Sequence, residues 1–176
     1  MNDALASIFK RRSVRKYTDK AIPESMITDM LEAAMAAPSA VAKDPWRFIV
    51  VQERGTLDKI AEGLPHGQML REAPLAFVVC GDIEVAHDGK LSYMLQDCSA
   101  AIENLLLAAS MLGLGGVWLG VHPREERIAH MRALFALPDN ILPISVLSIG
   151  WPAAEPAART RYDAAYVHRE RWEAGA

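Results

Sequence analysis

Five cations fall within seven residues near the N-terminus, in the stretch 10–16 (KRRSVRK). In an extended chain, Arg11, Ser13 and Arg15 point to the same side, because side chains alternate along a strand. In a helix, Arg11 and Arg15 share one face at i, i+4. Either conformation places two guanidinium groups beside a hydroxyl, an arrangement that suits a phosphate ester. A solvated charged surface is the alternative that this stretch alone leaves open.

The basic opening contrasts with the rest of the chain. The 176 residues carry a formal net charge of −3 and a sequence pI of 5.9, although a second basic pair, Arg159 and Arg161, lies in the C-terminal tail. This acidic balance, and the absence of base-stacking aromatic residues around the basic stretch, make a nucleic-acid arm the weakest interpretation.

The usual residues of hydrolytic chemistry do not form motifs. No GxSxG sequence occurs. Cys80 and Cys98 form no CxxC pair and lie in apolar stretches, so we expect reduced, buried thiols in a cytoplasmic protein. The histidines show no metal-ligand spacing; they are His66, His87, His122, His130 and His168.

A glycine cluster follows an apolar helical pattern. Gly113, Gly115, Gly116 and Gly120 do not fit GxGxxG, and they follow a helix where a dinucleotide fingerprint follows a strand. We expect a helix C-cap and a tight entry into a strand. Gly120 would in addition let the backbone approach a flat ligand closely.

Hydrophobic periodicity predicts the elements that must position these residues. The apolar run 105–121 is broken by GLGG, so it indicates a buried helix leading into a strand rather than a membrane span. Length and composition predict one domain, 1–176, whose layers are α/β or α+β. The expected helices are one that starts at Pro23 and ends before Pro38, 56–64 with Thr56 as N-cap, 94–112 and 123–137, and the expected strands are 47–52, 73–82, 116–121 and 141–150.

Four motifs in order resemble the FMN-dependent nitroreductase family. RRSVRKY resembles its R-R-S-x-R-x-[YF], and APSAVAKDPWRF resembles A-P-S-x-x-N-x-Q-P-W-x-F. DCSAAIENLLLAASMLGLGGVWLG is similar to the central helix and glycine-rich strand, and IGWPAAEPAARTRYDAAYVHRERW to I-G-x-P…K/R-x-R…V-H-x-x-W. The resemblance covers about 8–172, essentially the whole chain.

The resemblance implies an α+β three-layer sandwich with a mixed, mainly antiparallel central sheet flanked by helices. It also implies a homodimer with exchanged termini, in which the tail from about residue 152 extends over the partner subunit. Two FMN molecules would lie in clefts at the subunit interface.

The same resemblance implies roles for individual residues. The phosphate, ribityl chain and pyrimidine edge of FMN would be held by Arg11, Arg12, Ser13 and Arg15, with Arg159 and Arg161 approaching the phosphate. The isoalloxazine would be lined by Pro38, Ser39 and Ala40 from the other subunit and by the backbone of Leu119 and Gly120.

The chain departs from the family pattern in the second motif. Ala42 and Asp44 stand where the family form has Asn and Gln. Ala42 has no hydrogen-bonding side chain to offer FMN, and an ionised Asp44 can only accept. Lys43 is an alternative donor, and Glu103 replaces a frequent Gln in the central helix.

The implied activity is ping-pong electron transfer from NADH or NADPH through FMN to a nitroaromatic, quinone or similar small-molecule acceptor. Because the cofactor carries this chemistry, no side chain is named as catalytic. Two alternatives remain: another FMN reaction, such as reductive dehalogenation, enone reduction or substrate oxidation, and a flavin-binding module without turnover. Metal, nucleic-acid and membrane partners are not expected.

Overall fold

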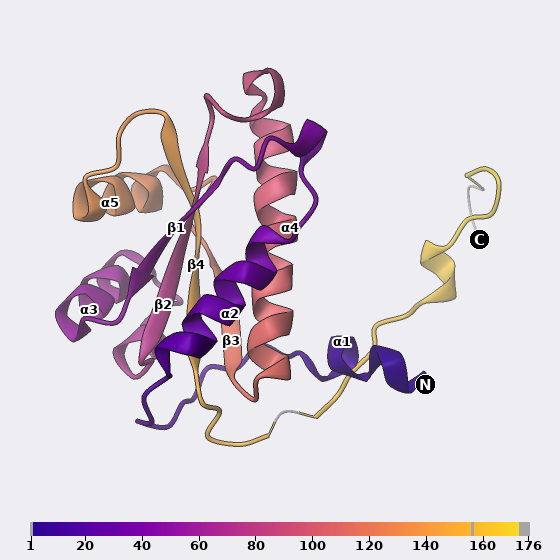
Figure 1. The fold of residues 1–176 in the computed structure, drawn as a ribbon, viewed down its shortest axis with the longest axis horizontal. Helices are drawn as coiled ribbons and strands as arrows, with labels where there is room; N and C mark the ends of the chain where they lie inside the picture. The colour runs from indigo at the N-terminus through magenta and orange to yellow at the C-terminus, as the bar shows by residue number, and fades with distance from the viewer. Residues whose placement is uncertain (1, 156, 173–176) are drawn as a thin grey trace.

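A four-stranded antiparallel sheet forms the middle of the structure (Figure 1). The computed structural model describes residues 2–155 and 157–172. The strands pair in the order β1-β2-β4-β3, so β1 and β3 are the two edges. Their bounds are β1 Trp46–Val51, β2 Leu75–Asp82, β3 Gly115–Gly120 and β4 Ile141–Gly150.

Helices cover both faces of this sheet and make three layers (Figure 1). Strand β2 is buried along its whole length, and its side chains alternate between two hydrophobic clusters. One cluster joins the sheet to α2 (Glu24–Met35) and α4 (Leu91–Met111), and the other joins it to α3 (Arg54–Gly63) and α5 (Glu125–Phe135). The expected α+β sandwich with a mainly antiparallel sheet is therefore confirmed.

Helix α4 is the longest helix of the described residues and ends as its sequence predicts. Gly113 adopts a φ of 81°, and the amide of Leu114 donates to the carbonyl of Ala109 at 2.8 Å. This is a Schellman ending, in which glycine takes the left-handed conformation at little steric cost. The chain then turns directly into β3.

The cap of α3 differs from the prediction. Glu53, not Thr56, is the N-cap, because its carboxylate accepts hydrogen bonds from the amides of Gly55 and Thr56. The Thr56 hydroxyl also donates to this carboxylate, and these hydrogen bonds lower the pKa of Glu53. The capping residue thus lies three positions earlier than expected.

The basic N-terminal stretch runs along the β3 edge. Ser13 forms a parallel bridge with Gly116, and the amide of Val14 donates to the Gly116 carbonyl at 2.9 Å. Val14 and Tyr17 are buried under this segment, whereas Ser13 and Arg15 remain exposed. Burial raises the pKa of Tyr17 to about 12.

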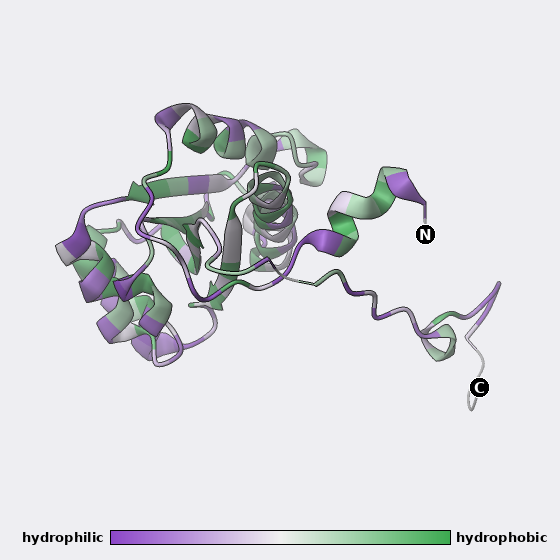
Figure 2. Cartoon of the chain, turned by 90° about the horizontal axis from the view of Figure 1, so that it is seen from below, coloured by the Kyte–Doolittle hydropathy of each residue, from purple (hydrophilic) through white to green (hydrophobic). Residues whose placement is uncertain are grey.

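The two ends of the chain meet and then leave the body. The amide of Arg159 donates to the Phe9 carbonyl at 3.1 Å, and Arg12 donates to the Ala157 carbonyl at 2.7 Å. Beyond this crossing the tail projects away from the layers, and Figure 2 shows hydrophobic residues on α1 (Ala6–Lys10), the short helix that contacts α4. The other helical segments of the described residues are short 3₁₀ helices: η1 Asp3–Leu5, η2 Ala40–Ala42, η3 Gln68–Arg71, η4 His87–Gly89 and η5 Ala164–Tyr166.

No helix within the described residues combines the length and apolar character needed to cross a membrane.

Candidate active site

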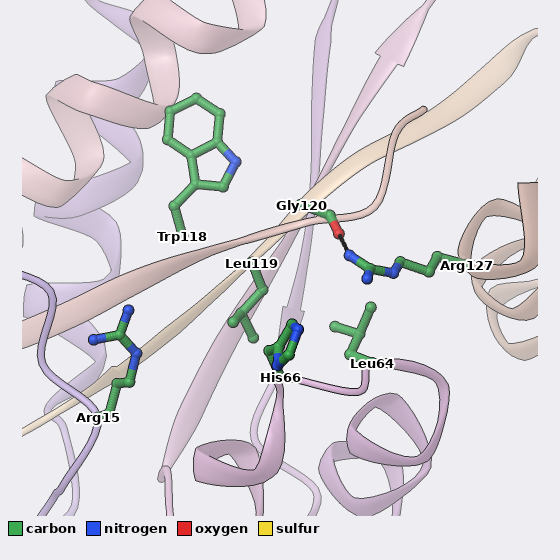
Figure 3. Close-up of a pocket in the computed structure, with 7 residues that line it drawn as sticks. All are labelled: Arg15, Leu64, His66, Trp118, Leu119, Gly120 and Arg127. Carbon is green, nitrogen blue, oxygen red and sulfur yellow. Dashed lines mark hydrogen bonds between the residues drawn. The ribbon is translucent and has the colours of Figure 1, made fainter. Parts of the chain in front are cut away.

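A hollow of about 290 Å³ lies at the end of β3, beside the basic N-terminal stretch (Figure 3). Two stretches that are distant in the sequence, the basic opening and the end of the glycine-rich strand, therefore meet at one cavity. Its lining residues are Arg15, Leu64, His66, Trp118, Leu119, Gly120 and Arg127.

Regular structure holds each side of this hollow. The pairing of Ser13 with Gly116 fixes the segment that carries Arg15, and pairing with β4 fixes Leu119 and Gly120. On the opposite side, the Arg54 guanidinium donates to the backbone carbonyls of Leu70 and Ala73. These bonds fasten the turn after α3, which carries Leu64 and His66.

The side chains around the hollow give it a positive character. Among the described residues, Arg15 and His66 have neither a hydrogen bond nor an ion pair, and no carboxylate is among the lining residues. Arg127 donates from Nη1 to the Gly120 carbonyl at 2.7 Å, as drawn in Figure 3. Unpaired cations that face an open hollow favour an anionic ligand.

The glycines of β3 have two different tasks. A Cβ on Gly116 would lie 2.5 Å from Ile149 Cδ1, and one on Gly115 would lie 2.6 Å from Val14 Cγ2, so both are required for packing. A Cβ on Gly120 would meet nothing closer than the His122 carbonyl at 3.9 Å. Space beside Gly120 is therefore open to a ligand, which suits a flat ring laid against the strand.

The other predicted phosphate ligands do not line this hollow. Arg11 pairs through Nε with Glu103 Oε1 at 3.1 Å, which gives the glutamate of the central helix a partner. Arg12 is bound to the tail at Ala157, and Ser13 is exposed on the β3 edge. The exposed Arg159 lies where the tail meets α1, since its amide donates to the Phe9 carbonyl, and Arg161 is exposed on the projecting tail.

Pro38, Ser39 and Ala40 lie at a second hollow, of about 340 Å³. This hollow is formed with residues of the first turns of α4: Tyr93, Gln96, Asp97 and Ala100. It shares no lining residue with the first hollow, and it lies on the α2–α4 side of the sheet. Within one chain, the two groups of predicted flavin-binding residues are therefore not brought together.

The loop at the second hollow satisfies its own polar groups. The Ser39 hydroxyl donates to Asp44 Oδ1 at 2.5 Å, and the Asp44 amide donates back to the Ser39 oxygen at 3.0 Å. The amide of Ala40 donates to Oδ1 of Asp97, whose Oδ2 is buried without a partner among the described residues. Asp44 thus holds the loop closed through its hydrogen bonds with Ser39. The family pattern, which has Gln at this position, does not predict this role.

The same loop holds three non-glycine residues in the left-handed region. The φ angles of Val41, Ala42 and Asp44 are 54°, 53° and 50°. This conformation costs about 1–2 kcal/mol for each such residue, so it requires support from its surroundings. The Ser39–Asp44 hydrogen bonds supply part of that support.

The cysteines are not activated. Cys80 and Cys98 are free and buried, and burial raises the pKa of each thiol to about 12. The described residues contain no cluster of three or more His, Cys, Asp or Glu side chains able to hold a metal ion.

Three lining residues belong to no sequence motif, although the loop 63–71, which contains two of them, is expected from the sequence to cover the cleft. Arg127 reaches Gly120 from α5, and Leu64 and His66 reach the hollow from the turn after α3. No local motif marks these residues, because their proximity depends on how both helices pack on the sheet. Trp118 lies in a strand as the sequence predicts, and its side chain, 38% exposed, points away from Leu119 and His66 in Figure 3.

Comparison with known proteins identifies relatives over nearly the whole chain. The model of the Nitroreductase family matches residues 8–67 and 57–151. A protein of Methanothermobacter thermautotrophicus, provisionally named NADH dehydrogenase/NAD(P)H nitroreductase, is 46% identical over 97% of this chain and 88% of its own length.

Two solved structures extend the comparison. A protein of Parabacteroides distasonis with the same provisional name is 41% identical, with a TM-score of 0.91 over 98% of this chain and 100% of its own. A nitroreductase of Desulfovibrio desulfuricans, solved in complex with FMN, is 30% identical, with a TM-score of 0.83 over 98% of this chain and 99% of its own.

Proposed function

Because the chain belongs to the nitroreductase family, we propose that it is an FMN-dependent oxidoreductase that takes electrons from NADH or NADPH and passes them to a small conjugated acceptor. The observation that carries this proposal is the hollow at the end of β3. It combines an unpaired guanidinium, apolar walls and a glycine whose missing side chain leaves room for a ligand.

The residues present fit FMN. Arg15 offers charge-assisted hydrogen bonds to an anionic edge or phosphate, and Leu119 offers an apolar surface. Gly120 lets the ring approach the backbone, since a Cβ built on it would meet, beyond its chain neighbours, only the His122 carbonyl at 3.9 Å. Arg11, Arg12, Ser13, Arg159 and Arg161 form the wider basic region where the chain ends cross, from which the phosphate would be held.

We infer that the active unit is a homodimer. Pro38, Ser39, Ala40 and Ala42 are remote in the fold from Arg15 and Gly120, so one chain does not surround a ring on both faces. A second copy would bring its loop over the hollow of the first, and the projecting tail from about residue 152 would pack on that copy. The tail exposes Tyr162, Tyr166 and Trp172, whose aromatic surfaces suit such an interface.

The groups that the site lacks support a reaction carried by the cofactor. The lining residues include no general acid–base pair and no activated nucleophile, so the cofactor would supply the redox chemistry when bound. The protein's part is to hold the ring, to place cations near it and to leave one cleft for reductant and acceptor in turn. Nitroaromatic compounds and quinones fit a shared, open cleft of this kind.

Absorbance spectroscopy tests this proposal. The purified protein, after incubation with FMN and removal of free FMN, is expected to retain a flavin spectrum. Anaerobic NADH or NADPH should bleach it, and a nitroaromatic compound or quinone should restore it. Protein that remains colourless after incubation with FMN would refute the function, and bound FMN that neither nucleotide bleaches would refute the reductant.

A further inference from the structure

Arg127 is the cation of the β3-end hollow that the family resemblance did not mark. It lies in the first turn of α5, and its side chain extends back to the last residue of β3 (Figure 3). Nη1 donates to the Gly120 carbonyl at 2.7 Å, so the position of the guanidinium is fixed by the sheet. The acceptor of this contact, Gly120, is itself one of the residues that line the hollow.

The charge of Arg127 has no counter-ion in the described part of the chain. None of the ion pairs among these residues involves Arg127, and its Nε is buried without a hydrogen-bond partner. A partly buried and unpaired cation is costly unless an anion approaches it. The neighbouring Arg15 and His66 bring no negative charge to the hollow.

The loop of the second hollow carries one cation, Lys43, which is exposed and makes no side-chain hydrogen bond or ion pair among the described residues. Asp44 is engaged with Ser39, and Ala42 has no polar side-chain group. Positive charge that the fold holds in place and directs at a flavin in the first hollow would therefore come from the side of β3. Reduction of FMN adds negative charge to the ring, and a fixed cation nearby favours the more negative state.

We propose that Arg127 is a positioning residue that holds the Gly120 backbone against the flavin and, by its unpaired charge, stabilises reduced FMN over oxidised FMN. This inference rests on the proposed function. It assigns a redox-tuning role to a side chain on α5, separate from the basic N-terminal stretch that would grip the cofactor.

The test compares three variants loaded with FMN. Arg127→Met removes the charge and the hydrogen bond, whereas Arg127→Gln removes the charge and keeps a donor for the Gly120 carbonyl. Arg124→Gln is the matched control. Arg124 directly precedes α5, is exposed, and its side chain makes no capping hydrogen bond to the helix. The measured quantity is the midpoint potential of bound FMN, which reports the ratio of its affinities in the oxidised and reduced states.

Both Arg127 variants are expected to weaken the preference for reduced FMN by about tenfold, which corresponds to a potential about 30 mV more negative for two electrons. The control should keep the wild-type potential. An Arg127→Gln protein with the wild-type potential would overturn the inference, and this variant decides the matter if Arg127→Met does not fold. Wild-type protein that binds no FMN would instead refute the proposed function.

Discussion

The two hollows of this protein are built in opposite ways. At the end of β3, the sheet holds a positively charged cavity in which Arg15 and His66 lack hydrogen-bond partners among the described residues. Beside α4, the loop from Pro38 to Asp44 ties its polar groups to one another and to Asp97. The first hollow leaves its polar groups available to a ligand, whereas the loop at the second hollow uses its polar groups in hydrogen bonds that hold its own conformation.

This difference indicates a division of labour. The β3 hollow supplies charge and a place for the backbone to contact a flat ring, and the loop supplies a preformed wall with few groups left to bond. A loop with three left-handed non-glycine residues would not hold such a shape without internal hydrogen bonds. The missing amide donors at Ala42 and Asp44 are consistent with a wall of this kind.

The largest effect is expected from filling the space beside Gly120. Gly120→Ala should weaken FMN binding by at least about tenfold, because the added methyl group enters space that the protein leaves open to a ligand. Isothermal titration with the apoprotein measures the affinity. Thermal unfolding of the same apoprotein should remain close to that of the wild type.

Gly116→Ala is the matched control on the same strand. Its Cβ would lie 2.5 Å from Ile149 Cδ1, so it should destabilise the apoprotein by about 1–3 kcal/mol through overpacking. Loss of stability in Gly120→Ala with unchanged FMN affinity would reverse the roles assigned to the two glycines.

A smaller effect is expected in the loop. Ser39→Ala and Asp44→Ala should each destabilise the protein, and a double-mutant cycle should give a coupling of about 1 kcal/mol, because the Ser39 hydroxyl donates a hydrogen bond to the Asp44 carboxylate. Urea unfolding of the wild type, both single variants and the double variant supplies the four free energies. Additive effects would show that the clamp contributes nothing to the loop.

The sequence predicted the elements more completely than it predicted their contacts. Strand β4 has the expected bounds, 141–150, and the ending of α4 at Gly113 follows from the left-handed preference of glycine. The N-cap of α3 was assigned to Thr56 because short hydroxyl residues dominate that position, whereas the longer Glu53 side chain reaches both free amides.

The sequence predicts only part of the candidate site, because some of its residues come together only through the packing of distant elements. Arg15 and Gly120 belong to recognisable motifs, and the structure places both at one hollow. Arg127 and His66 lie in stretches without a motif, and packing of α5 and the turn after α3 brings them to the hollow. The Ser39–Asp44 clamp was missed because Asp44 was compared with a flavin contact rather than with its neighbour five residues away.

The most direct test of the account is complementation between two defective variants. Gly120→Trp places a bulky side chain in the open space beside the end of β3, and Ala40→Trp places one at the second hollow, so each homodimer should lose FMN binding. If one site takes its hollow from one subunit and its loop from the other, equal mixing after unfolding and refolding should restore about a quarter of the wild-type FMN sites. Flavin absorbance per chain measures this recovery, and a mixture that binds no more FMN than either variant alone would contradict a site shared between two subunits.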